Sequence, residues 1–288
     1  MIELGLMLAA FLAFMKGFQS VYERKGAVST DEFVTAWASR AFGVPVLLAA
    51  VLIQDLPPLS TEFFIAVIPQ SLAITAASVI IAKAFKESDA SIVTPMFALS
   101  PVLVLITSFV VLGEVPSLSG VIGVGLVAAG AYSMKIEGSQ HVLQPFRRLW
   151  SEKGVQLILT VIMLYSVTSV VDKIGVKSSS PAVWSFSVVT LSSIFLFPVM
   201  TRKSGEWRKK LRTDWKPLTF LGGIGGAAAI VQMTAIKLTL VTYVISIKRL
   251  SIPLTVILSY LLLGEKESIK GRLLGAALMT AGALMIIL

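Results

Sequence analysis

Long runs of apolar residues alternate with short polar breaks along the whole chain. Reading the runs between charged or turn-rich breaks gives ten segments, at 2–22, 33–53, 63–85, 91–112, 118–134, 155–171, 181–200, 217–236, 242–263 and 269–288. A helix needs about 20 mostly apolar residues to cross the hydrocarbon core of a bilayer, and most of these runs approach that length. The pattern therefore predicts an all-α membrane protein with ten transmembrane helices.

The two halves of the chain repeat one another. Leu112-Gly113-Glu114 recurs 151 positions later as Leu263-Gly264-Glu265, and at the same offset Ala84-Phe85-Lys86 matches Ala235-Ile236-Lys237, Leu99-Ser100 matches Leu250-Ser251, and Gly120 matches Gly271. We expect a first five-helix repeat at 1–136, a linker at 137–153 and a second repeat at 154–288. Because each unit has an odd number of spans, the second enters the membrane in the opposite orientation. Such inverted repeats are typical of secondary transporters.

Composition agrees with a bilayer environment and narrows the chemistry. The chain is 56% hydrophobic and 14% charged, whereas soluble domains are roughly half apolar and a quarter charged. It has no Cys and one His, which excludes disulfides, thiolate metal sites and multi-His metal sites, so we expect no cofactor. The net charge of +9 comes mostly from loop residues without aromatic interleaving. We expect a lipid bilayer and a small-molecule substrate as partners, no nucleic acid, and a monomer or homodimer.

Several weak motifs in a constant order resemble one family. The Leu-Gly-Glu ends of segments four and nine, the glycines that start segments five and ten, Ala-x-Lys at the ends of segments three and eight, and Arg40-Ala41-Phe42 together resemble the drug/metabolite transporter superfamily, EamA type. The resemblance covers nearly the whole chain. It implies a substrate cavity near the membrane midplane, lined by segments one to four and six to nine. Lys16 departs from it, because many members carry Trp before the glycine that is Gly17 here.

Four basic residues fall well inside predicted spans, away from their ends: Lys16, Arg40, Lys248 and Arg249. Each costs roughly 2.5 to 3.5 kcal/mol at the bilayer centre on insertion scales, so each needs a functional or structural reason. No acidic residue lies well inside a predicted span to neutralise them. An anionic substrate is therefore a candidate partner.

Lys248 and Arg249 carry the strongest form of this hypothesis. Adjacent helical residues differ by about 100°, so both can face one cavity, and Ser251 and Thr255 continue a polar stripe below Lys248. The equivalent positions of the first repeat hold Phe97 and Ala98, so the shared scaffold does not require charge there. A Lys-Arg pair on the ninth span also resembles the plastid sugar-phosphate translocators, where it binds phosphate. The alternative is that both side chains extend to the headgroups.

The remaining candidates each have a structural alternative. Lys16 can face the cavity or pair with Glu23, and Arg40 can bind substrate or brace helices. Gln232 and Tyr243 can line the cavity or form interhelical hydrogen bonds. Glu114 and Glu265 can cap helices or lie solvated at the membrane interface, or they can carry coupling protons. Gly222-Gly223 with Gly225-Gly226 can mark an unwound or hinged stretch of segment eight, although membrane helices carry Gly routinely.

Together these features predict a multi-pass protein of the cell (inner or plasma) membrane that moves a small metabolite, an organic anion, by alternating access. The rival within transport is an exporter of amino acids or of neutral or cationic metabolites, with the basic residues structural. An enzyme is not expected, since no acid, base, nucleophile or metal set is clustered.

The orientation in the membrane is open. Apart from the four basic residues inside spans, 18 Lys and Arg lie at the loops after odd-numbered segments and three at those after segments six and eight. By the positive-inside rule both termini then face outward. The family resemblance implies cytoplasmic termini.

Overall fold

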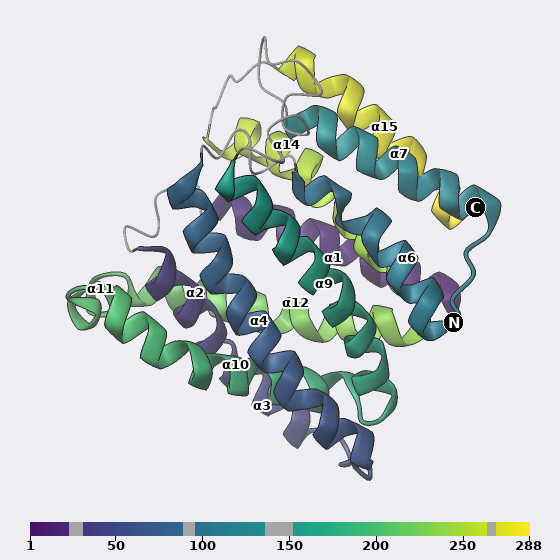
Figure 1. The fold of residues 1–288 in the computed structure, drawn as a ribbon. Coiled ribbons are helices and arrows are strands. Elements are labelled where there is room, and N and C mark those ends of the chain that lie inside the picture. Colours follow the sequence, from purple (N-terminus) through teal and green to yellow (C-terminus); the bar gives the residue numbers. More distant parts are fainter. Residues whose placement is uncertain (23–30, 89–95, 136–151, 264–268) are drawn as a thin grey trace.

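The computed structural model describes residues 1–22, 31–88, 96–135, 152–263 and 269–288, and every regular element within these ranges is a helix (Figure 1). The first half contains α1 (Ile2–Tyr22), α2 (Glu32–Ala41), α3 (Val44–Leu52), α4 (Thr61–Glu87), the short 3-10 helix η2 (Phe97–Leu99), α6 (Ser100–Leu112) and α7 (Leu118–Lys135). The second half contains α9 (Lys153–Lys177), α10 (Pro181–Lys203), α11 (Trp207–Thr213), α12 (Trp215–Leu238), α13 (Val241–Lys248), α14 (Ser251–Leu263) and α15 (Ile269–Ile287).

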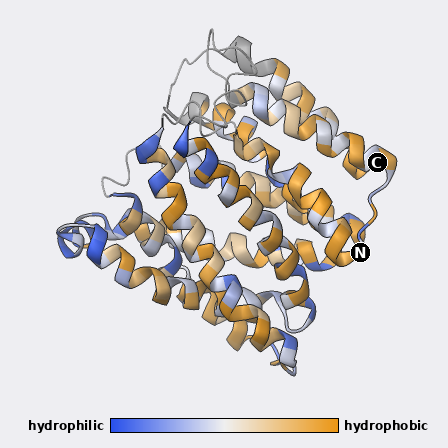
Figure 2. Cartoon of the chain, in the orientation of Figure 1, coloured by the Kyte–Doolittle hydropathy of each residue, from blue (hydrophilic) through white to orange (hydrophobic). Residues whose placement is uncertain are grey.

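Seven helices in the described part are long and apolar enough to cross a membrane. They are Ile2–Tyr22, Glu32–Leu52, Thr61–Glu87, Lys153–Lys177, Pro181–Lys203, Trp215–Leu238 and Val241–Leu258, and three shorter apolar helices cover Phe97–Leu112, Leu118–Met134 and Leu274–Ile287. The prediction of an all-α membrane protein is thus confirmed, and seven of the ten predicted segments meet this length criterion. Hydrophobic residues make up most of the length of these helices (Figure 2), as expected where lipid is the solvent.

Local sequence determines where several helices begin and end. The Asp31 carboxylate accepts hydrogen bonds from the backbone N–H groups of Phe33 and Val34, which caps α2. Ser180 does the same for Val183 at the start of α10. Gly113 ends α6 in the left-handed conformation, at φ 65°, which glycine adopts without steric cost.

Two predicted spans are interrupted. Segment 33–53 divides into α2 and α3 at Phe42 and Gly43, and segment 242–263 divides into α13 and α14 at Arg249 and Leu250. The second break has a local cause: Pro253 has no N–H to donate to the carbonyl of Arg249 one turn earlier. The first repeat has the same feature, because η2 precedes α6 at the equivalent positions.

The glycines of segment eight serve packing. They do not mark an unwound stretch, which was one of the possibilities, since α12 runs unbroken through them. A Cβ atom on Gly226 would lie 2.8 Å from the Gly43 carbonyl oxygen, and one on Gly222 would lie 2.6 Å from the Cβ of Phe42. These glycines therefore allow α12 to approach the α2–α3 break closely. The connection 201–216, expected to be a loop, contains α11.

Helices of one half pack against the other half in the same way as their equivalents do. α4 packs against α9 as its equivalent α12 packs against α1, and α10 packs against α4 as α2 and α3 pack against α12. The equivalent helices α7 and α15 pack against each other and run antiparallel, because Gly123 meets Gly282 while Gly130 meets Gly275. This pattern is that of an inverted repeat.

Candidate functional site

A cavity of about 190 Å³ lies between α1, α4, α9, α10 and α12. Its polar lining comes from Lys16, Asp172, Ser185 and Gln232, with the indole of Trp184 beside them. The rest of the wall is apolar or glycine, and is supplied by α4, α10 and α12. Because both halves contribute helices, the cavity lies at the interface of the two repeats.

Lys16 projects from α1 into the cavity lining. Its Nζ donates a hydrogen bond to Oε1 of Gln19 at 2.9 Å, one turn further along the helix. The following residue, Gly17, lets α14 approach α1, since a Cβ there would lie 3.1 Å from the Cβ of Leu254. The departure from the family pattern at Lys16 thus places an amine on the cavity wall.

Asp172 lines the cavity, although the predicted site residues did not include it. Segment six was predicted to end at residue 171, but α9 continues to Lys177 and buries Asp172 to 7% exposure. Its Oδ1 accepts hydrogen bonds from Nε2 of Gln70 at 2.7 Å and from Nε1 of Trp184 at 2.8 Å. The expectation that no acidic residue lies well inside a span is therefore wrong. The signal that was available is the pairing of Asp172-Lys173 with Glu23-Arg24 in the repeat.

The basic pair of segment nine lies at the break between α13 and α14. Lys248 Nζ donates to Oε1 of Gln232 at 3.2 Å, which connects it to the cavity wall. Arg249 instead donates from Nη2 to Oγ of Ser100 on α6, and its buried Nε has no hydrogen-bond partner among the described residues. Both side chains remain partly exposed. Adjacent in sequence, they reach toward different halves of the molecule.

Arg40 makes two hydrogen bonds to protein groups. Nη1 donates to the Ala36 carbonyl at 2.6 Å, and Nη2 donates to Oγ of Ser78 at 2.7 Å, which ties α2 to α4. These contacts are those of a residue that braces helices.

Three further predicted site residues, Tyr243, Ser251 and Thr255, lie away from the cavity lining. The hydroxyl of Tyr243 accepts a hydrogen bond from the N–H of Ser117 at 3.2 Å, in the connection that leads into α7. Thr255 donates to the Ser251 carbonyl at 2.7 Å, within α14, and lies against Gly17 of α1. Of the eight residues predicted for the site, the structure brings Lys16 and Gln232 to the cavity and Lys248 against Gln232.

A buried ion pair joins the two halves at one end of this arrangement. Lys173 Nζ lies 3.3 Å from Oε1 of Glu114, with 8% and 9% of the two side chains exposed. Lys173 also donates to the Thr239 carbonyl at 2.5 Å, and Oε2 of Glu114 accepts from the N–H of Val241 at 3.0 Å. The Glu114 carboxylate thereby caps the N-terminus of α13, and helix capping is one of the alternatives given for this residue. Glu265, its equivalent, lies outside the described residues.

Comparison with known proteins places the chain among transporters. The model of the EamA-like transporter family matches residues 3–135 and again residues 152–288. A solved structure titled "Crystal structure of protein" is similar over 97% of this chain and 95% of its own, with a TM-score of 0.74 and 16% sequence identity, a likeness that shows the fold alone. No curated protein matches the chain in sequence.

Proposed function

The chain belongs to the EamA-like transporter family, and from that premise we propose that it is a secondary transporter that carries a small organic anion by alternating access. The observation that supports an anion most directly is the environment of Lys248 and Arg249. The hydrogen-bond partners of both are the neutral groups of Gln232 and Ser100. Cationic groups deep in a membrane protein require a neutralising partner, and a bound anion supplies one.

The size of the cavity limits the substrate. Pockets that enclose drug-sized ligands have volumes of about 300 to 1,000 Å³, and this cavity, at about 190 Å³, is smaller. A small metabolite fits this volume. The polar groups of Lys16, Asp172, Ser185 and Gln232 are sufficient to orient it.

The symmetry of the fold supports alternating access as the mechanism. Transporters with inverted repeats bind substrate near the midplane between the repeats, at discontinuous helices, and expose it to each side in turn. In this chain α13 stops at Lys248, and the cavity lies between the repeats. An anion that neutralises Lys248 and Arg249 would bind the occluded state more tightly than the open states and so shift the population toward it.

One observation favours the rival function, export of an amino acid or of a neutral or cationic metabolite. Asp172 lines the same cavity as Lys16, so the wall carries both signs of charge, and a zwitterion could bind between them. Arg40, moreover, donates to the carbonyl of Ala36 on its own helix and to the hydroxyl of Ser78 on α4, so a basic residue of this chain can serve to join helices. In that case Lys248 and Arg249 are structural.

A ligand screen distinguishes anion transport from the rival, export of an amino acid or of a neutral or cationic metabolite. We expect inorganic phosphate, glycerol phosphate or malate to raise the melting temperature of the purified protein, because a ligand that binds only the folded state stabilises it. Leucine and choline serve as the zwitterionic and cationic comparisons. Stabilisation by leucine alone would support the rival.

Replacing Lys248 and Arg249 together with Gln tests the role of the basic pair. We expect uptake of the stabilising anion into liposomes to fall by at least about tenfold, since about 1.4 kcal/mol of lost binding energy suffices for that change. The matched control replaces Arg202 and Lys203, an adjacent and exposed Arg-Lys pair at the end of α10, with Gln. Uptake that is equal in both double variants contradicts the anion hypothesis.

A further inference from the structure

Asp172 is held by neutral donors alone. Its side chain is buried on α9 between Gln70 of α4 and Trp184 of α10, and both hydrogen bonds end on Oδ1. None of the ion pairs that the structure shows among its described residues includes Asp172. A carboxylate buried in a membrane protein without a cationic contact partner is of the kind that binds and releases protons in pumps and transporters.

Two buried oxygens, on residues that contact Asp172 or share its cavity, have no hydrogen-bond partner among the described residues. They are Oγ of Ser185, which lines the same cavity and is 3% exposed, and Oε1 of Gln70, which is 2% exposed. Buried polar atoms are normally hydrogen-bonded, so each unsatisfied one requires an explanation. A protonated carboxyl group has an O–H to donate, and hydroxyl and amide carbonyl oxygens are of the kind that accept it. The surroundings of Asp172 thus contain hydrogen-bond donors for its charged form and unpaired acceptor oxygens for its neutral form.

The charged groups around Asp172 act from a distance. Among the helices packed against α9, α13 brings Lys248, which attracts Asp172 electrostatically. Lys16 of α1 lines the same cavity, and the neighbouring Lys173 is engaged by Glu114. In their described parts, α4 and α10 bring the neutral groups of Gln70 and Trp184 to Asp172, and α12 brings the neutral Gln232 to the same cavity. A negative charge on Asp172 therefore weakens the positive field that an anion would meet in the cavity.

We propose that Asp172 binds a coupling proton, so that the transporter takes up one proton together with its anion. Protonation removes a negative charge from the cavity wall and strengthens anion binding. By thermodynamic reciprocity, a bound anion strengthens proton binding by the same factor. The proposal rests on the anion transport proposed above and adds its driving force, an inwardly directed proton gradient.

The indole of Trp184 provides a reporter of the protonation state, because its N–H donates to the carboxylate. In a variant that keeps Trp184 and has Phe at the other four tryptophan positions, we expect the fluorescence to change between about pH 5 and about pH 9, the range in which buried carboxyl groups titrate. Asp172→Asn should abolish the change, since Asn retains an oxygen to accept from Gln70 and Trp184 but does not titrate. Asp172→Glu should retain it. A flat titration of the Asp172 protein overturns the proposal.

A second measurement avoids the tryptophan replacements. Infrared difference spectra of the otherwise native chain, recorded between the same pH limits, should contain a carboxylic acid C=O band that Asp172→Asn removes. Titration in sodium and in N-methylglucamine buffers distinguishes a proton site from a sodium site. A midpoint that sodium lowers overturns the proposal in favour of a sodium site; equal midpoints support it.

Transport measurements then test the coupling with malate and inorganic phosphate as probes. With an acidic exterior and a gradient of about one pH unit, one proton per anion sustains up to about tenfold accumulation in liposomes. We expect Asp172→Asn to lose this accumulation, and accumulation equal to that of the native chain overturns the proposal. If the native chain transports neither probe while Trp184 titrates with Asp172, the proposed anion transport fails and the proton site stands.

Discussion

The contacts of single residues separate the charged groups of this chain into those held by partners away from the cavity and those at the cavity wall. Arg40 donates to a backbone carbonyl and to a serine hydroxyl away from the cavity lining, and Lys173 pairs with the Glu114 carboxylate and donates to the Thr239 carbonyl. Lys248 contacts Gln232 on the cavity wall, and Asp172 lines the cavity itself. Charge inside the span is therefore a poor guide to function until the partner of each group is known.

The buried pair of Glu114 and Lys173 gives a prediction at this scale. Lys173→Met leaves the carboxylate buried and unpaired, and loss of one partner of such a pair costs about 3 to 5 kcal/mol of the free energy of unfolding. Glu114→Gln in addition should recover much of that loss, since the Gln carbonyl oxygen can still accept from the N–H of Val241. Denaturant titration in detergent micelles measures both.

The matched control for this pair is Lys209→Met. Lys209 lies 3.5 Å from Glu206, but 78% and 73% of the two side chains are exposed, so this ion pair contributes little. The explanation in terms of burial is refuted if Lys173→Met and Lys209→Met destabilise the protein equally.

At the scale of helices, small residues decide which elements pack closely. Without a hydrophobic force between helices in lipid, association depends on van der Waals contact, and glycine lets backbones approach. α7 and α15 use two such contacts, Gly123 with Gly282 and Gly130 with Gly275. The α12 glycines serve the α2–α3 break in the same way.

Two glycines of α7 allow a direct test of this packing. A Cβ atom on Gly123 would lie 2.5 Å from the Gly282 carbonyl oxygen, whereas nothing lies within 4 Å of a Cβ on Gly125. We expect Gly123→Ala to lower the melting temperature. Gly125→Ala should leave it unchanged or raise it slightly, because Ala favours helix over Gly by about 0.5 to 1 kcal/mol. Equal effects of the two replacements would exclude backbone contact as the reason for Gly123.

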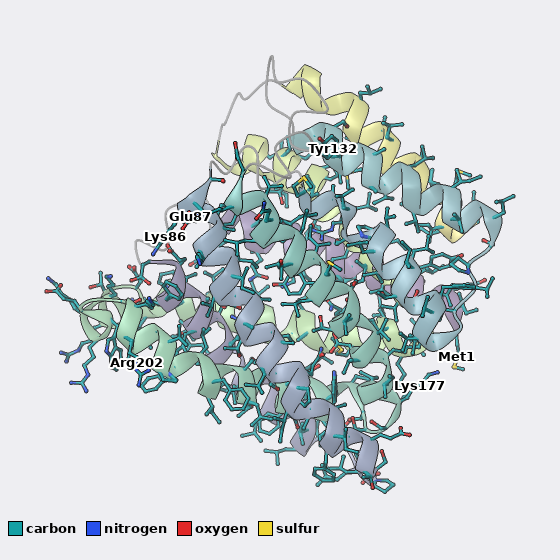
Figure 3. All side chains as sticks on the ribbon, viewed as in Figure 1. Met1, Lys86, Glu87, Tyr132, Lys177 and Arg202 are labelled. Atoms are coloured by element: carbon teal, nitrogen blue, oxygen red, sulfur yellow. The ribbon has the colours of Figure 1, made fainter. Side chains whose placement is uncertain are left out.

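At the scale of the whole molecule, the charge distribution predicts an orientation. Hydrophilic residues are concentrated around α11 and the adjoining helix ends (Figure 2). Lys86, Glu87 and Arg202 lie toward that side of the bundle, whereas Met1 and Lys177 lie toward the opposite side (Figure 3). Basic residues favour the cytoplasmic face, so the positive-inside rule predicts that both chain ends face outward.

Labelling of single introduced cysteines tests the orientation, and because the chain has no native Cys, only the introduced residue reacts. Lys177 and Arg202 are both exposed. We expect a membrane-impermeant maleimide to label Lys177→Cys in intact cells and Arg202→Cys only after permeabilisation. The reverse pattern means cytoplasmic termini, as the family resemblance implies.

The sequence by itself determined that the chain is an all-helical membrane protein with two repeats of a transporter family, because hydrophobic length, turn residues and a constant offset are local properties of the chain. It located α1 at residues 2–22 and α7 to within one residue. Only the tertiary structure decided which polar groups share a site. Asp172 meets Gln70 across 102 positions, and Glu114 meets Val241 across 127. Such pairings depend on how each helix is rotated and packed against the other repeat, which no local pattern specifies.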